Sequence, residues 1–222
     1  MQLPPPLTET ELEQRVQAIA HLSIAQIAQQ CHWQVPENLN HNKGWMGQLI
    51  EKALGTSAKN LSEPDFLELG IELKTIPIKK NGYPAETTYV CQVPLSNQLG
   101  LFWENSCVAK KLKRVLWLPI ESNPRLNLAD RKIGQGFIWS PNQEETENLQ
   151  EDWEELMEYV AFGQIDQIDS TYGEYLQIRP KAANAKARTQ GISESGFYQA
   201  TMPRGFYLRT AFTYQIIQSE AS

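Results

Sequence analysis

Apolar residues recur at helical spacing near both ends of the chain, and between them the pattern changes to short extended runs. Two possible capping boxes within residues 8–13 open a pattern with an apolar face, and a further box at 23–26 predicts a second helix. A third helix is expected over about 43–55, and it ends at a glycine, which is a common helix stop. The longest helical pattern covers about 143–162.

The extended runs predict a mixed α/β sheet flanked by helices. The turn signal Asn81-Gly82 separates two runs, and the second is expected to continue the same sheet. Pro119 indicates that its strand ends there or lies at an edge, since proline cannot donate to the ladder. The predicted strands cover residues 71–74, 86–94, 114–120, 133–140 and 172–179, and further helices are expected near 108–112 and 211–218.

Composition places the chain among ordinary globular proteins. It has 222 residues, of which 41% are hydrophobic and 21% charged, and a mean hydropathy of -0.46. This length suits a single domain, and no apolar run approaches a membrane span. The three cysteines form no disulfide framework and no cysteine–histidine cluster has zinc spacing, so a reducing cytoplasm without a zinc site is expected.

Charge is segregated along the chain. The net charge is -6, yet residues 106–132 and 171–215 are mainly basic, whereas the ten acidic residues of 142–169 are accompanied by no lysine or arginine. Such a distribution can give an acidic protein a positive groove, and a positive groove suits the binding of nucleic acid. The alternative is that these are solvated faces. The acidic face of the 143–162 helix would repel DNA and is interpreted as solvated, with docking of a partner protein as the lesser alternative.

The candidate chemistry lies in the ten residues from Asp65 to Lys74. Side chains two apart on a strand share a face, so Glu72 and Lys74 stand side by side, and the preceding turn can return Asp65 to them. Two carboxylates suit Mg²⁺, which polarises a phosphate and acidifies a bound water, and a lysine can orient that water or stabilise negative charge. The alternative is an ordinary solvated strand face.

Four further segments give this triplet a family context. They are Lys43-Gly-Trp-Met-Gly-Gln-Leu-Ile-Glu51-Lys-Ala-Leu-Gly55, Lys110-Lys-Leu-Lys-Arg-Val-Leu-Trp117, Arg179-Pro-Lys-Ala-Ala-Asn-Ala-Lys186 and Pro203-Arg-Gly-Phe-Tyr-Leu208. Together they resemble the MutH family of strand-nicking endonucleases, which belongs to the type II restriction endonuclease-like superfamily. The resemblance extends from about residue 12 to 214. It implies a mixed sheet flanked by helices, with two arms around a DNA-binding cleft.

The resemblance also implies the active-site residues. Asp65 and Glu72 would bind the metal, with the backbone carbonyl of Leu73 as a further ligand. Mg²⁺ is the expected ion, and Mn²⁺ or Ca²⁺ could occupy the same site. The catalytic set by resemblance is Glu51, Asp65, Glu72, Lys74 and Lys111. The lobe that includes the catalytic core would cover about residues 8–165, and about 166–218 would contribute DNA-recognition segments.

The resemblance further implies the substrate and partners. Family members cut the unmethylated strand of hemimethylated GATC sites in double-stranded DNA, and Tyr207 matches the position that senses the adenine methyl group. The DNA-binding residues by resemblance are Lys43, Arg179, Lys181, Lys186, Arg204 and Tyr207. MutL is the expected activator, and MutS acts indirectly. A monomer is expected, and no nucleotide-binding motif is present, so any ATP step comes from another protein.

Two other functions remain open at this point. One is a GATC-specific type II restriction endonuclease of the same fold, which would cut both strands without MutL. The other is a DNA-binding module without catalysis, whose carboxylates only form a solvated strand face.

Overall fold

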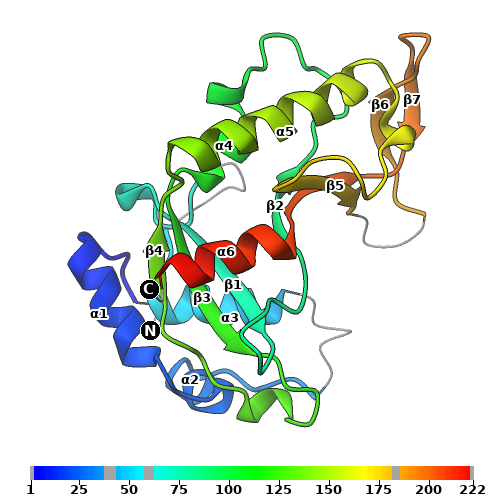
Figure 1. Ribbon diagram of the computed structural model, residues 1–222. Coiled ribbons are helices and arrows are strands. Elements are labelled where there is room, and N and C mark those ends of the chain that lie inside the picture. The colour runs from blue at the N-terminus through cyan, green and yellow to red at the C-terminus, as the bar shows by residue number, and fades with distance from the viewer. Residues whose placement is uncertain (1–2, 38–43, 58–62, 182–185, 221–222) are drawn as a thin grey trace. The chain divides into compact units, whose positions relative to one another are not determined.

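The protein divides into two compact units, each built from two stretches of the chain. The computed structural model describes residues 3–37, 44–57, 63–181 and 186–220 (Figure 1). The first unit contains residues 1–86 and 113–140, and the second contains residues 87–112 and 141–222. The expected organisation as one endonuclease domain with two lobes stays a prediction.

A three-stranded mixed sheet forms the centre of the first unit. The strands are β1 (Glu72–Ile78), β3 (Val115–Glu121) and β4 (Phe137–Trp139), in the order β1-β3-β4. β1 runs parallel to β3, and β3 runs antiparallel to β4. The predicted mixed α/β architecture is therefore confirmed for this unit.

Three helices pack on one face of this sheet (Figure 1). They are α1 (Glu9–Ile19), α2 (Ile24–Gln30) and α3 (Trp45–Leu54). Their buried apolar residues form one cluster with Leu116, Leu118 and other alternate residues of β3. Because strand side chains alternate between faces, Val115 and Trp117 lie on the opposite face of the sheet.

The helix boundaries follow from capping. The Thr8 hydroxyl accepts a hydrogen bond from the backbone N–H of Glu11, so Thr8 is the N-cap of α1, while the Glu11 carboxylate accepts from the Leu7 N–H instead of completing the capping box. Ser23 and Gln26 form the reciprocal capping box of α2. α3 ends where Gly55 adopts the left-handed conformation, with φ of +78°. All three predicted helices are confirmed.

The prediction that Pro119 ends its strand or lies at a sheet edge was wrong, because β3 is the central strand. The Pro119 carbonyl accepts from the Gly134 N–H, so its backbone faces the β4 side of the sheet. On that side the ladder with β4 covers only Val115–Trp117. Pairing on that side resumes at the bridge between Ile120 and Ile133, so the missing proline N–H falls between the β4 ladder and this bridge.

A second three-stranded sheet lies in the second unit. Its strands are β2 (Thr88–Gln92), β8 (Arg204–Leu208) and β5 (Leu176–Pro180), in the order β2-β8-β5, and both pairs are antiparallel. The expectation that the run after Asn81-Gly82 continues the first sheet was wrong. Among the described residues, a single bridge between Ile78 and Pro84 joins the segment after this turn to β1. β2 pairs instead with β8, which the sequence pattern did not identify as a strand.

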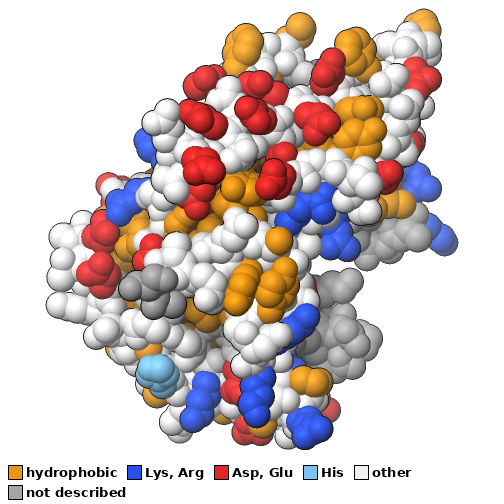
Figure 2. Space-filling view, in the orientation of Figure 1, with side chains coloured by type: hydrophobic (Ala, Val, Ile, Leu, Met, Phe, Trp, Pro, Cys, Tyr) orange, Lys and Arg blue, Asp and Glu red, His pale blue; other side chains and the backbone are white. Residues whose placement is uncertain are grey.

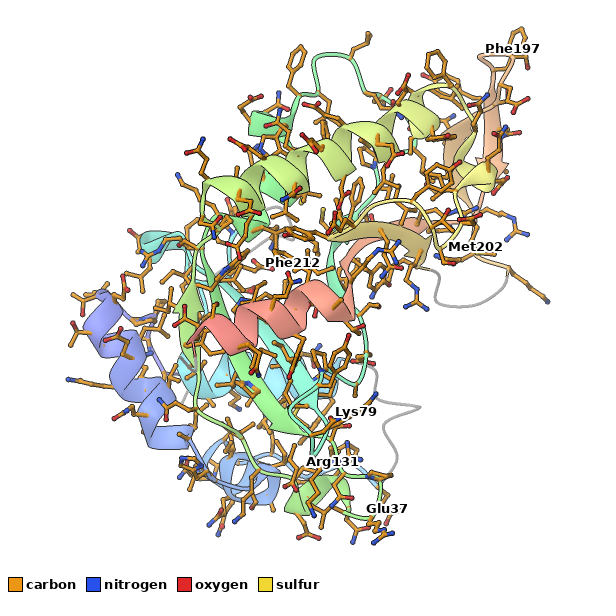
Figure 3. The ribbon with its side chains drawn as sticks, in the orientation of Figure 1. Glu37, Lys79, Arg131, Phe197, Met202 and Phe212 are labelled. Atoms are coloured by element: carbon orange, nitrogen blue, oxygen red, sulfur yellow. The ribbon has the colours of Figure 1, made fainter. Side chains whose placement is uncertain are left out.

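The second unit also contains a two-stranded hairpin and three helices. The hairpin consists of β6 (Thr189–Ile192) and β7 (Tyr198–Thr201), and the helices are α4 (Cys107–Leu112), α5 (Gln143–Ala161) and α6 (Thr210–Glu220). Phe212 lies on α6 (Figure 3). Its ring stacks on that of Tyr175, with centroids 3.9 Å apart. Short 3₁₀ helices are η2 (Leu67–Leu69), η3 (Trp103–Asn105), η4 (Leu128–Asp130) and η5 (Ile165–Gln167).

The predicted long helix is confirmed as α5, which begins with a capping box between Asn142 and Glu145. It ends before Gly163, whose φ is +70°. Within the described ranges, no helix combines the length and apolar character needed to cross a membrane.

Candidate functional site

The structure holds the three residues of the carboxylate–lysine triplet on one short stretch of backbone. Glu72 and Lys74 project from the same face of β1, and the Lys74 Nζ lies 2.6 Å from the Glu72 Oε1. Asp65 approaches from the preceding turn, where its Oδ2 accepts a hydrogen bond from the Leu73 N–H at 2.8 Å. The structure thus confirms that Glu72 lies beside Lys74 and that the turn returns Asp65 to their strand, while the meeting of all three side chains at one metal stays a prediction.

The sheet register explains where each of these groups lies. Glu72 pairs with Val115 and Lys74 with Trp117, so the ion pair occupies the face opposite α1, α2 and α3. The Glu72 N–H bonds the Arg114 carbonyl, at the start of β3, so the Leu73 N–H points to the open edge of β1. Asp65 therefore binds at the sheet edge, beside the strand that carries the ion pair.

The turn before β1 has a defined geometry. Phe66 and Ile71 form an antiparallel bridge around η2, and Gly70 adopts φ of +64°. The backbone of Asp65 is held as well, since its carbonyl accepts from the Ser57 N–H at 2.9 Å. Both the backbone and the carboxylate of Asp65 are thus fixed by local hydrogen bonds.

Burial separates this strand from an ordinary solvated one. Glu72 is 3% exposed, and the side chain of Lys74 is 12% exposed. The interpretation of Glu72 and Lys74 as a solvated strand face is therefore wrong. Desolvating two charges offsets much of their attraction, so such a pair is weak evidence for stability and better evidence for a functional site.

The donor set fits a hard divalent cation. Mg²⁺ usually takes one or two carboxylates together with water and substrate oxygens, and Asp65 and Glu72 supply two carboxylates on adjoining backbone. The described residues contain no cluster of three or more His, Cys, Asp or Glu side chains arranged for a metal. Two carboxylates of this kind suit Mg²⁺ with a coordination shell completed by water and substrate oxygens.

The other predicted active-site residues lie on other elements. Glu51 is on α3 in the first unit. Its carboxylate lies over the preceding turn of the helix, where the Oε1 would be 3.9 Å from a Cβ added at Gly47. Lys111 is on α4 in the second unit and is 6% exposed. Lys43, a predicted DNA contact, lies outside the described residues. The catalytic roles of Glu51 and Lys111 stay predictions.

A second cluster of predicted residues lies on one face of the β2-β8-β5 sheet. Tyr207 of β8 pairs with Tyr89 of β2, and their rings meet edge to face with centroids 5.3 Å apart. The Arg179 guanidinium lies 5.9 Å from the Tyr207 ring centroid, and the Lys181 Nζ lies 4.0 Å from that of Tyr89. Two cations and two aromatic rings thus form one surface, which suits the phosphates and base edges of DNA.

The backbone allows this cluster to pack tightly at Gly205. A Cβ added there would meet Tyr89 Cε2 at 2.8 Å, Tyr207 Cε2 at 3.1 Å and Lys181 Cβ at 3.3 Å. Burial raises the pKa of Tyr89 to about 12, still further above physiological pH than the ordinary tyrosine value. Sequence reasoning missed Tyr89 and assigned no role to Gly205, because the pairing of β2 with β8 was not predicted.

The remaining predicted DNA contacts differ in their surroundings. Arg204 bonds the Asp166 carboxylate, and its side chain is 14% exposed. Lys186 is exposed in a turn before β6. Figure 2 shows Lys and Arg side chains near β5 and the β6–β7 hairpin. DNA binding by these residues stays a prediction.

One buried carboxylate was missed by the sequence analysis. Asp152 belongs to the acidic α5 helix, yet it is 8% exposed. Its two oxygens accept from three consecutive backbone N–H groups, those of Glu174, Tyr175 and Leu176, at 2.6 to 2.8 Å. It thereby fixes the start of β5, the strand that carries Arg179. The helical periodicity of α5 was a usable signal, since Asp152 lies three residues after Leu149 and four before Leu156, both of which are buried.

These features define a class of protein: a mixed α/β fold with a buried carboxylate–lysine site and a separate cationic–aromatic surface. A family profile described as "DNA mismatch repair enzyme MutH" matches residues 54–152. The chain is 52% identical over 213 residues to the DNA mismatch repair protein MutH of Shewanella baltica (strain OS185), covering 96% of each chain. It is 53% identical over 214 residues to that of Vibrio parahaemolyticus, covering 96% of this chain and 95% of the relative. The chain therefore belongs to the MutH family of DNA mismatch repair enzymes.

Proposed function

We propose that this protein is a Mg²⁺-dependent endonuclease that nicks the unmethylated strand at hemimethylated GATC sites during mismatch repair. The observation that carries the proposal is the buried Glu72–Lys74 pair beside the anchored Asp65. Membership of the mismatch repair family supplies the setting, and the site supplies chemistry suited to a phosphodiester.

The proposed roles of the residues follow from their chemistry. Asp65, Glu72 and the backbone carbonyl of Leu73 would hold the metal, which when bound supplies Lewis-acid polarisation of the phosphate and a more acidic water. Lys74 would orient the attacking water or stabilise the developing negative charge. Glu51 would assist the metal site from α3, and Lys111 would act as a second active-site lysine.

Recognition is assigned to the cationic–aromatic surface. Arg179 and Lys181 would contact phosphates or base edges, and Tyr207 would lie against the N6 edge of the GATC adenine. The ring contact with Tyr89 and the close approach at Gly205 support this role, because a rigid ring can reject an added methyl group sterically. Lys43, Lys186 and Arg204 would add further contacts to the DNA.

The proposal includes the cellular partners. MutL would activate the enzyme after MutS detects a mismatch, and the ATP-dependent step would belong to those proteins. A monomer with one active site suits cutting of one strand, and the cytoplasm is the proposed location.

A strand-resolved cleavage assay tests the proposal. The substrates are three otherwise identical duplexes, each with a single GATC site. The first is unmethylated, the second is methylated on one strand, and the third is methylated on both strands. With Mg²⁺ we expect nicks only in unmethylated strands, loss of cleavage in EDTA, and recovery on adding Mg²⁺. Asp65→Ala should abolish cleavage and retain DNA binding measured in EDTA.

The alternatives give different products. Concerted breaks in both strands without MutL would favour the restriction endonuclease. Binding without cleavage of any duplex, even with MutL and ATP added, would favour the non-catalytic module. Unchanged cleavage by Asp65→Ala would overturn the site assignment in either enzyme.

A further inference from the structure

The second unit contains an apolar groove that the proposed nuclease activity does not use. It has a volume of about 830 Å³ and lies between α5, the loop that precedes η3, and the β6–β7 hairpin. Trp103 and Trp153 form part of its wall, with ring centroids 6.0 Å apart. Exposed side chains at the groove include Leu99 and Phe102, which are 102% and 65% exposed. Large exposed apolar side chains gathered at one groove indicate an interaction site.

The charges of the groove have a single sign. Glu104, Glu154 and Glu158 line it, and no lysine or arginine does so among the described residues. Figure 2 shows acidic side chains gathered over α5, with hydrophobic side chains close to them. This potential repels the phosphates of DNA and favours a cationic ligand.

The wall opposite α5 is already ordered by hydrogen bonds. The Gln98 side-chain amide donates to the Pro94 carbonyl at 3.0 Å, and the Asn105 amide donates to the Gly100 carbonyl at 2.8 Å. The Phe102 N–H donates to the Asn105 Oδ1 at 2.9 Å. A wall held in this way loses little conformational entropy when a ligand binds, so the groove is suited to recognition without prior folding.

We infer that this groove binds a segment of a partner protein that presents two or three aliphatic side chains flanked by lysine or arginine. The aliphatic groups would pack against Trp103 and Phe102, and the basic groups would face Glu154 and Glu158. An amphipathic basic helix has this chemistry, because its apolar and charged side chains recur on defined faces. The inference does not depend on the proposed nuclease activity, since none of these residues belongs to the catalytic or DNA-binding sets.

Peptide binding to the full-length protein tests the inference. The probe is a fluorescein-labelled helical peptide with leucines at i, i+4 and i+7 and lysines around them. One control peptide replaces lysine by glutamate and the other replaces leucine by serine. By fluorescence anisotropy, we expect the leucine–lysine peptide to bind at least about tenfold more tightly than either control peptide, the ratio equal to about 1.4 kcal/mol.

Matched variants locate the binding. Phe102→Ala and the pair Glu154→Lys with Glu158→Lys should each weaken binding by about tenfold or more. Phe197→Ala removes another exposed aromatic, at the tip of the β6–β7 hairpin (Figure 3), that does not line the groove. Glu151→Lys with Glu155→Lys reverses two exposed charges of the same helix that also lie outside the groove. Both controls should change binding by less than about twofold.

Three results would overturn the inference: no binding of the leucine–lysine peptide, equal binding of the glutamate peptide, or equal losses in the control and groove variants. Circular dichroism melting of each variant excludes unfolding as the cause of a loss. Basal DNA cleavage should be unchanged in the groove variants.

Discussion

Each unit of this protein buries one carboxylate among its described residues, and the two have different partners. In the first unit Glu72 bonds a lysine, which leaves a charged pair on the face of a strand. In the second unit Asp152 receives three backbone N–H groups and serves to hold a turn. Burial alone therefore does not mark a catalytic acid. The bonded partner distinguishes the two, because a lysine can still act on a substrate, whereas backbone N–H groups that are already bonded cannot, and this contrast supports the proposed role of Glu72.

The two candidate regions, the carboxylate–lysine site and the cationic–aromatic surface, also differ in their exposure to solvent. The carboxylate–lysine site is built within ten consecutive residues, and its ion pair is shielded from solvent. The cationic–aromatic surface takes residues from three strands, and its cations Arg179 and Lys181 are exposed. Chemistry at a phosphodiester needs fixed charges in a low dielectric, whereas recognition needs cations that DNA can reach.

The largest effect is expected when the buried pair is broken. Glu72→Ala removes a proposed metal ligand and leaves Lys74 without its 2.6 Å partner. We expect the cleavage rate at saturating DNA to fall by at least about 10²- to 10³-fold, as when one stabilising charge is removed from an active site. Single-turnover cleavage measures this, and DNA binding in EDTA should change little.

Glu68→Ala is the control for this variant. Glu68 lies on η2 in the same turn and is exposed, so its loss should leave the cleavage rate within about twofold. If Glu68→Ala and Glu72→Ala reduce cleavage equally, the contrast between the buried pair and its exposed neighbour is wrong.

The first region could be predicted from the sequence because its determinants are local. Strand alternation places Glu72 beside Lys74, and a turn of a few residues can return only a nearby group, so Asp65 was found. Helix caps such as Ser23 with Gln26 are equally local, and they were also predicted correctly. What the pattern could not give was burial, since the same alternation describes a solvated strand.

The second region depends on pairing between distant segments, and the sequence pattern does not encode such pairing. Tyr89 and Tyr207 became neighbours only because β2 pairs with β8, and β8 itself was not recognised as a strand. Arg179 and Tyr207 were named from the family resemblance, and residue patterns alone would have left Tyr207 open to an ordinary core role. Asp152 was hidden among the acidic residues of a helix interpreted as solvated.

The next largest effect is expected in stability, at Asp152. Asp152→Asn leaves one oxygen to accept three N–H donors and turns an amide NH₂ group toward at least one of them. We expect the free energy of unfolding to fall by about 2–4 kcal/mol, measured by urea denaturation. The cleavage rate of the folded protein at saturating DNA should be nearly unchanged, in contrast to Glu72→Ala.

Glu151→Gln is the matched change at the exposed neighbour on α5, and it should shift the free energy of unfolding by less than about 0.5 kcal/mol. If folded Asp152→Asn instead loses its cleavage rate at saturating DNA while its free energy of unfolding is unchanged, the roles assigned to the two buried carboxylates are reversed.

A smaller effect is expected at Arg179, whose guanidinium lies above Tyr207 and also donates to the Thr87 hydroxyl at 2.9 Å. Arg179→Ala should weaken DNA binding by about 1–3 kcal/mol. Arg179→Lys keeps the charge but loses the planar group, so a base-edge contact predicts a loss in both variants and a phosphate contact predicts a loss mainly in the alanine variant. Equal affinity of both variants and the parent protein would remove Arg179 from the recognition surface.

The smallest and most specific effect is expected at Gly205. In Gly205→Ala the new Cβ would overlap Tyr89 at 2.8 Å and press on Tyr207 at 3.1 Å, so both rings must shift by a fraction of an ångström. Rejection of a single methyl group by a fitted pocket is worth about 1–3 kcal/mol, and a displaced ring should lose part of it. We expect the ratio of cleavage rates for unmethylated and methylated strands to fall by about threefold.

Gly191→Ala provides the steric control, since its Cβ would meet Thr201 Cγ2 at 2.7 Å on the β6–β7 hairpin, without contacting either tyrosine. Strain of this size alone should lower the free energy of unfolding without changing the ratio of cleavage rates for unmethylated and methylated strands. A changed ratio in Gly205→Ala but not in Gly191→Ala would assign strand discrimination to the packing of Tyr207 against Tyr89. An unchanged ratio in both variants would place the methyl-sensing contact elsewhere, and the recognition surface would then be a phosphate-binding surface alone.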